Sequence, residues 1–94
     1  MAAYVIALVT EKDAAKMKEY AAGAGPTLAP AGGEVLIRAK VVETMAGSLS
    51  PDRCLIIKFE SAAAARAWYK SPEYQRMIPI RDVAMKPDFL LIEE

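Results

Sequence analysis

The sequence predicts an α+β fold of element order βαββαβ, in which a four-stranded antiparallel sheet carries both helices on one face. Three observations predict it. The chain has 94 residues, enough for one small domain, which we expect to span residues 1–94. Four segments are rich in large apolar and β-branched residues, as strands are. Two further segments carry apolar residues at helical spacing.

The first part of the chain is predicted to form a strand and a helix. Residues 4–9 are apolar without polar alternation, which is typical of a central strand buried on both faces. Residues 12–24 are predicted to be a helix, which Thr10 can cap. The apolar stripe of this helix consists of Met17, Tyr20, Ala21 and Ala24. Gly32 and Gly33 indicate a turn rather than a phosphate-binding loop, because they precede a strand and lack the GxGxxG pattern.

The second strand is predicted over residues 34–40, where polar and apolar residues alternate. Alternation of this kind favours an antiparallel strand with one partly polar face. One predicted face holds Val35, Ile37 and Ala39, and the other holds Glu34, Leu36, Arg38 and Lys40.

The second half is predicted to repeat the order strand, helix, strand. Residues 53–59 are apolar on both sides. Ser61 is a good cap for a helix over residues 62–70, whose packing stripe is formed by Trp68 with Ala64 and Ala65. Ser71 and Pro72 then favour a short helix over residues 72–77, Pro79 interrupts it, and residues 80–85 form a further turn or two. Residues 89–92 are the last predicted strand, which completes a ferredoxin-like pattern.

The predicted sheet also favours assembly. The strands at residues 4–9 and 53–59 are apolar on both faces, whereas helices cover only one face of such a sheet. A bare second face would expose several large apolar side chains, and a two-fold partner is the simplest cover for it. We therefore expect a homodimer.

Composition argues against several classes of function. Lys and Arg number 12 and Asp and Glu number 12, and the basic residues are scattered, which argues against a nucleic-acid partner. Histidine is absent, so Ser-His-Asp and Cys-His catalysis and His-ligated haem are excluded within this chain. The single cysteine cannot form an intrachain disulfide or a Cys-based metal site. We therefore expect no metal and no cofactor. We also expect no membrane partner and a cytoplasmic location, because the apolar N-terminal run is too short for a membrane helix and lacks signal-peptide character.

Candidate functional residues are few, and each has a structural alternative. Cys54 begins an apolar strand and is interpreted as a small hydrophobic residue rather than a nucleophile. Trp68 and Tyr74, with Tyr69 between them, form an aromatic cluster that is either core or a ligand platform, and Tyr20 has the same two interpretations.

Arginine supplies the candidate anion anchor. Arg81 lies where the chain turns back to the last strand, and it could clamp a carboxylate with its two-pronged guanidinium. It could equally be a structural strut paired with Asp82, Asp88 or Glu73. Arg38 is the second candidate, because it falls on the partly polar face of its strand.

The segment Trp68–Gln75 (WYKSPEYQ), followed by Arg81, resembles the signature of the domain-of-unknown-function 1330 family. Ala31–Gly33 before the second strand and Leu90–Glu93 at the end are also similar. The resemblance implies a dimeric α+β barrel of two ferredoxin-like protomers and no established activity. The wider superfamily includes cofactor-free monooxygenases, small isomerases, haem enzymes and ligand-sensing domains, many of which hold their site between sheet and helices.

Two hypotheses remain open. The first is a small-molecule-binding protein or a metal-free enzyme, oxygenase-like or isomerase-like, acting on a small organic acid or an aromatic ligand. Its pocket would lie between sheet and helices, with Tyr20, Trp68 and Tyr74 as walls and Arg81 or Arg38 as anion anchor. The second is a non-catalytic dimerising structural or interaction module. A cavity beside these residues would favour the first, and a filled protomer would favour the second.

Overall fold

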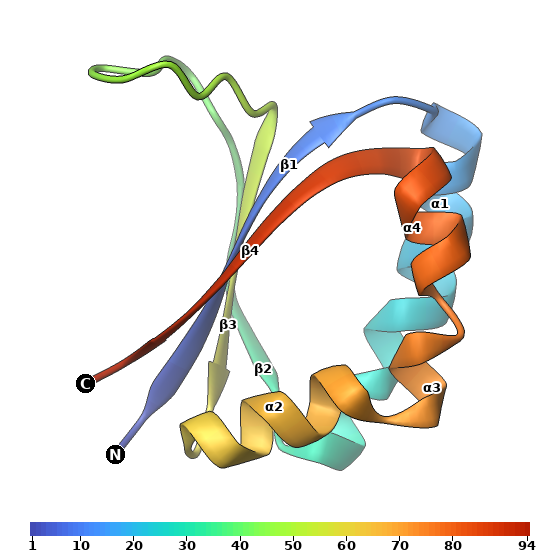
Figure 1. The fold of residues 1–94 in the computed structure, drawn as a ribbon, viewed down its shortest axis with the longest axis vertical. Coiled ribbons are helices and arrows are strands. Elements are labelled where there is room, and N and C mark those ends of the chain that lie inside the picture. Colours follow the sequence, from blue (N-terminus) through green and yellow to red (C-terminus); the bar gives the residue numbers. More distant parts are fainter.

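The computed structural model describes all residues 1–94 and shows one antiparallel sheet of order β2-β3-β1-β4. The strands are β1 (Ala3–Glu11), β2 (Glu34–Lys40), β3 (Arg53–Phe59) and β4 (Met85–Glu93). The helices are α1 (Ala14–Ala24), α2 (Ala62–Lys70), α3 (Pro72–Gln75) and α4 (Ile78–Ala84), and two 3-10 turns, η1 (Gly25–Thr27) and η2 (Ala29–Ala31), follow α1. All helices lie on one face of the sheet, as predicted (Figure 1).

β1 is a central strand, paired with β3 on one side and β4 on the other. Its side chains toward the helices, Ala3, Val5, Ala7 and Val9, are buried. Those on the other face are only half-buried, because nothing in this chain covers that face. Within one protomer, the predicted burial of both faces is therefore met on the helical face alone.

A β-bulge in β2 makes the predicted division of its side chains wrong. Val35 pairs with Ile57, but Ile37 pairs with Ile56, so Leu36 is an extra residue in the ladder. Directly paired residues of antiparallel strands share a face. After the bulge, Ile37 and Ala39 consequently lie on the outer face, whereas Arg38, opposite Leu55, lies on the helical face.

Capping residues explain where the helices begin. Asp13 accepts a hydrogen bond from the Lys16 N–H at 2.9 Å, so α1 begins at Ala14. Thr10 does not cap the helix, because it still belongs to β1 and pairs with Lys86. Ser71 caps α3 as expected, accepting from the Tyr74 N–H at 3.2 Å. Gly32 ends η2 with a φ of 78°, in the left-handed region that favours glycine.

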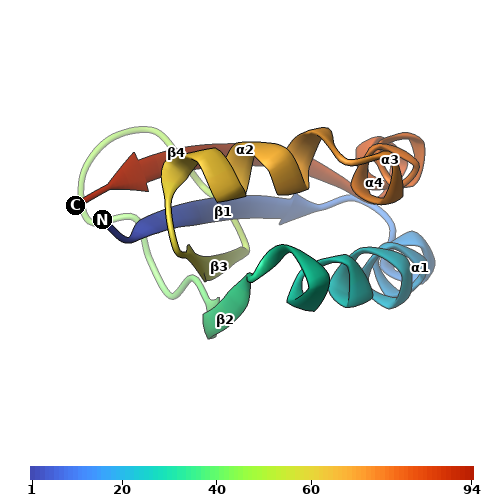
Figure 2. The same cartoon turned by 90° about the horizontal axis from the view of Figure 1, so that it is seen from below.

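The main core lies between α2, α3 and the sheet. Trp68 and Tyr74 are 3% and 0% exposed and pack with Phe59, so the aromatic cluster belongs to the core. The Trp68 indole N–H donates to the Thr27 hydroxyl at 2.9 Å, which joins α2 to η1. Figure 2 shows α1 on the β2 side of the helical layer and α4 on the β4 side.

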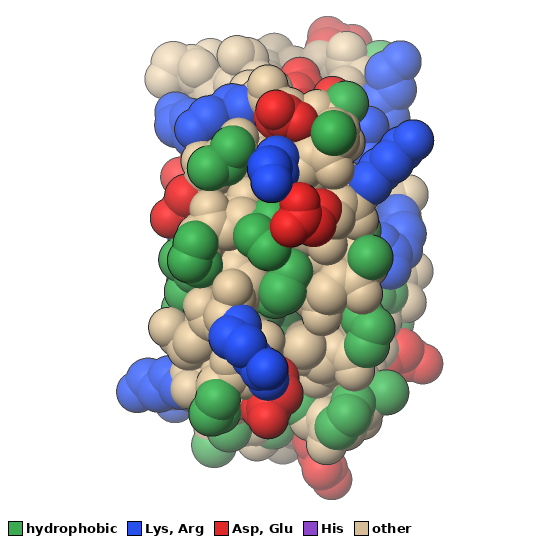
Figure 3. Space-filling view, turned by 90° about the vertical axis from the view of Figure 1, so that its right-hand side faces the viewer, with side chains coloured by type: hydrophobic (Ala, Val, Ile, Leu, Met, Phe, Trp, Pro, Cys, Tyr) green, Lys and Arg blue, Asp and Glu red, His purple; other side chains and the backbone are tan.

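The outer surface of the helical layer carries both signs of charge, interspersed with apolar side chains (Figure 3). None of the helices has the length and apolar character needed to cross a bilayer.

Candidate functional site

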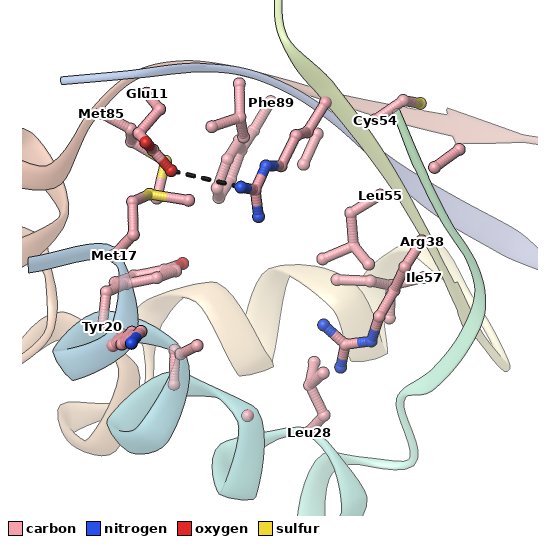
Figure 4. Close-up of a pocket in the computed structure, with 18 of the residues that line it drawn as sticks. Glu11, Met17, Tyr20, Leu28, Arg38, Cys54, Leu55, Ile57, Met85 and Phe89 are labelled. Carbon is pink, nitrogen blue, oxygen red and sulfur yellow. Dashed lines mark hydrogen bonds and ion pairs between the residues drawn. The ribbon is translucent and has the colours of Figure 1, made fainter. Parts of the chain in front are cut away.

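A cavity of about 490 Å³ lies between α1 and the helical face of the sheet (Figure 4). This volume falls within the range of about 300–1,000 Å³ that small-molecule sites usually have. Fifteen of its 20 lining residues are hydrophobic. Ile57 and Leu55 of β3 face it from the sheet, and Leu28 and Met17 face it from the helical side. The cavity therefore suits a ligand with a large apolar body.

Small residues on α1 keep this space open. The stripe predicted from the sequence, Met17, Tyr20, Ala21 and Ala24, does face the sheet and lines the cavity. Ala14 of α1 and Gly25, the first residue of η1, line it as well. Since alanine and glycine reach only a short way toward the sheet, α1 and the sheet do not fill the volume between them.

The charged groups of the cavity are mostly basic. Lys18, Arg38 and Arg53 line it, together with the single acid Glu11. Arg53 Nη2 lies 3.3 Å from Glu11 Oε1, which offsets one positive charge (Figure 4). The Arg38 guanidinium has no ion-pair partner in the chain, and it points into the cavity. The remaining positive charge favours an anionic group on a ligand.

Arg81, unlike Arg38, is largely buried and bonded to other side chains of the protein. The Arg81 side chain is 11% exposed, and its Nε donates to Asp82 Oδ1 at 3.1 Å. Its Nη1 donates to the hydroxyls of Tyr69, at 2.8 Å, and Tyr74, at 3.3 Å. The guanidinium also lies 5.4 Å from the ring centroid of Phe89. Burial by itself lowers the pKa of Arg81, but these hydrogen bonds raise it above its ordinary value, so the group stays charged.

The phenols of Tyr74 and Tyr20 connect Arg81 to the cavity. The Tyr20 and Tyr74 hydroxyl oxygens are 2.9 Å apart, and the rings meet edge to face. Burial raises the pKa of both phenols above the usual value of 10.0. Both are therefore neutral hydroxyls at physiological pH and act as hydrogen-bonding groups rather than as bases.

The structure separates the five candidate residues into two groups. Tyr20, Arg38 and Trp68 line the cavity. Tyr74 and Arg81 do not line it, and they reach it only through the Tyr20 hydroxyl. Arg81 pairs with Asp82, which is one of the three carboxylates that the sequence offered as its partner.

Arg53 and Phe89 line the cavity but were not singled out in the sequence. Arg53 could have been found from the two-residue alternation of a strand. It falls on the same face of β3 as Leu55, Ile57 and Phe59, which is the helical face. For Phe89 the same alternation holds along β4, where it pairs with Ala7.

Cys54 is a free, half-buried thiol on β3. It pairs with Leu8 and Ala39 on the outer face, and its sulfur points away from the cavity (Figure 4). The chain contains no group of three or more metal-ligating side chains.

Solved structures share this fold at low sequence identity. A protein of unknown function from Rhodopseudomonas palustris superimposes with a TM-score of 0.84 at 18% identity, over 99% of this chain and 82% of that chain. A dimeric ferredoxin-like protein of unknown function from Jannaschia has a TM-score of 0.72 at 14% identity, over 100% of both chains. SnoaB, a cofactor-independent oxygenase from Streptomyces nogalater, has a TM-score of 0.70 at 13% identity, over 99% of this chain and 92% of that chain. The chain thus has the ferredoxin-like α+β fold predicted for it.

The family model described as Domain of unknown function (DUF1330) matches residues 2–94. No curated protein matches the chain.

Proposed function

The chain belongs to the DUF1330 family, and we propose that it is a small-molecule-binding protein whose ligand occupies the cavity between α1 and the sheet. The observation that carries this proposal is an apolar cavity of about 490 Å³ into which the unpaired Arg38 points. A guanidinium with no carboxylate partner is available for an external anion. The expected ligand is a small organic acid with an aromatic or other apolar body.

The test is calorimetric titration with 4-benzylbenzoate, an aromatic acid, and with its neutral methyl ester. We expect the acid to bind and Arg38→Ala to weaken that binding at least about tenfold, the effect of losing a charge-assisted hydrogen bond. Arg66→Ala is the matched control, because Arg66 is an exposed arginine of α2 outside the cavity.

A second variant tests whether the cavity is the place of binding. Ala21 is exposed and lines the cavity, so Ala21→Phe adds volume there without disturbing a buried residue. We expect a folded protein that no longer binds the acid. Failure of the acid to bind at millimolar concentration, even if the ester binds, or unchanged binding in both variants, would overturn the proposal.

A metal-free enzymatic reaction in the same cavity is a second candidate. It is supported by the likeness to SnoaB, which is described as a cofactor-independent oxygenase. Tyr20 and Arg38 would then orient a bound aromatic substrate, which would itself react with oxygen. Oxygen uptake with easily oxidised hydroxyaromatic acids tests this, and uptake that is equal in the wild-type protein and in Arg38→Ala would count against it.

We propose that the protein acts as a homodimer formed through the outer face of the sheet. A row of apolar side chains crosses all four strands there, through the pairs Ile37–Ile56, Ile56–Ile6 and Ile6–Leu90. Ile37 and Leu90 are 48% and 54% exposed. Apolar rows of this kind are usual at interfaces and unfavourable in water, and several proteins of the same fold are described as dimeric.

Sedimentation velocity tests the dimer. Leu90→Glu introduces a charge into the row and should produce monomers, whereas Val83→Glu should not, because Val83 is equally exposed but lies on α4. A wild-type monomer at micromolar concentration would refute the dimer. A stable dimer that binds none of the probes would favour the alternative of a non-catalytic dimerising module.

A further inference from the structure

The Tyr20 hydroxyl forms part of the cavity wall and is directed toward the open space (Figure 4). We propose that Tyr20 is a neutral hydrogen-bond donor of this cavity, beside its cationic groups, and that the ligand is a keto acid: its carbonyl oxygen accepts from Tyr20 while its carboxylate faces Arg38. This inference rests on the proposed binding function and deepens it, because it assigns a second recognition group and the direction of its hydrogen bond.

The partners of Arg81 and Tyr74 determine which hydroxyl donates in the hydrogen bond between Tyr74 and Tyr20. A guanidinium only donates hydrogen bonds. The Tyr74 oxygen must therefore be the acceptor of the 3.3 Å contact with Arg81 Nη1. Tyr74 is 0% exposed, so its own hydroxyl hydrogen cannot reach water and needs an acceptor within the protein. The Tyr20 oxygen, 2.9 Å away, is that acceptor.

The Tyr20 hydroxyl is thus left with a hydrogen of its own. Tyr20 makes no side-chain hydrogen bond other than the one with Tyr74. Its oxygen already accepts from Tyr74, so its hydrogen is available to a molecule in the cavity. Burial raises the pKa of Tyr20, so the hydroxyl keeps this hydrogen through the neutral range. Arg81 and Tyr74 act here as positioning residues, since they orient the donor without lining the cavity.

The two recognition groups come from different elements. Tyr20 belongs to α1 and Arg38 to β2, and Figure 4 shows them on separate sides of the open space. Most of the side chains around that space, including Met17, Leu55 and Ile57, are apolar. A ligand that satisfies both groups therefore carries a hydrogen-bond acceptor and an acid that are separated by an apolar body.

Two acids that differ at one group test the proposal. In 4-benzoylbenzoate a carbonyl joins the rings, and in 4-benzylbenzoate a methylene takes its place, so shape and charge are closely matched. We expect the wild-type protein to bind the ketone about two- to tenfold more tightly, the usual contribution of one neutral hydrogen bond. In Tyr20→Phe that preference should disappear, while the affinity for the methylene acid should stay within about twofold.

Controls separate this inference from the proposed function. Tyr4→Phe removes a phenol that donates to Glu94 and does not line the cavity, and it should leave the preference intact. Arg38→Ala should weaken both acids and keep their ratio. If both acids bind but the wild-type protein does not prefer the ketone, or if Tyr20→Phe keeps the preference, the Tyr20 inference is wrong and the binding function stands. If neither acid binds, the binding function itself fails.

Discussion

The two candidate arginines occupy contrasting regions of the molecule. Arg81 is 11% exposed, pairs with Asp82 and donates to the hydroxyls of Tyr69 and Tyr74. Arg38 is exposed, has no ion-pair partner in the chain and points into the cavity. Arg81 donates from Nε and Nη1 to partners within the protein, whereas the donors of Arg38 remain for a ligand.

This difference shows that residue type alone does not distinguish a strut from an anchor. Both side chains have the same chemistry, and both were reasonable anion anchors in the sequence. Their roles follow from the partners that the fold supplies. The expected effects of substitution therefore differ in kind: stability should depend on Arg81 and its hydrogen bonds, and ligand affinity on Arg38.

The largest effect on stability is expected for Arg81→Ala. Loss of a mostly buried guanidinium removes three hydrogen bonds and its packing against Phe89, which should cost about 2–3 kcal/mol. Urea unfolding measures this loss. Arg81→Lys should restore only part of it, because lysine lacks the planar fork. An unchanged urea midpoint together with lost ligand binding would instead make Arg81 the anion anchor and reverse its contrast with Arg38.

Tyr74→Phe should have a smaller effect in the same direction. The substitution keeps the buried ring but removes the hydroxyl that joins Arg81 to Tyr20. We expect a loss of about 1–2 kcal/mol in the free energy of unfolding. If the loss in Arg81→Ala and the loss in Tyr74→Phe add fully in the double variant, the two residues do not form one network.

The buried phenols should also make stability fall in alkali. The pKa of Tyr20 is raised above its unfolded value of 10.0, chiefly by burial. Above pH 10 the unfolded chain loses a proton that the folded chain keeps, so the free energy of unfolding decreases as pH rises. The slope is at most about 1.4 kcal/mol per pH unit for each such phenol. Below about pH 9 the contribution is constant.

Unfolding of the wild-type protein and Tyr20→Phe at pH 8, 9, 10 and 11 checks this slope. The variant should lose less stability between pH 10 and pH 11. Parallel curves for the two proteins would show that Tyr20 titrates alike in the folded and unfolded states.

The smallest effect on stability is expected for Arg38→Ala. Because Arg38 is exposed and makes no ion pair, its removal should change the free energy of unfolding by less than about 0.5 kcal/mol. A slight increase is consistent with relief of repulsion from Lys18 and Arg53 at the same cavity. A loss above 1 kcal/mol would show a structural role and remove the contrast with Arg81.

Much of the fold was predictable because it depends on local patterns. The β-branched runs, the cap at Ser71 and the proline that follows it act over a few residues, so they can be recognised without tertiary information. The α1 stripe was also predicted, but the sequence left open whether Tyr20 belongs to a core or to a ligand site. Whether Met17 and Tyr20 fill a core or border a cavity depends on how far the helix stands from the sheet, and this distance depends on residues remote in sequence.

By itself the sequence determined the order of the elements, the zero net charge, the absence of histidine from any site, and a sheet with an apolar outer face. Only the tertiary structure decided which side chains face the cavity. The bulge at Leu36 turns Arg38 to the helical face, against the regular two-residue alternation of a strand. The return of α4 toward the sheet brings Arg81 to Tyr74, and Tyr74 lies 2.9 Å from the Tyr20 hydroxyl across 54 residues of chain. Such contacts depend on register and packing between distant segments, which a pattern along the chain does not encode.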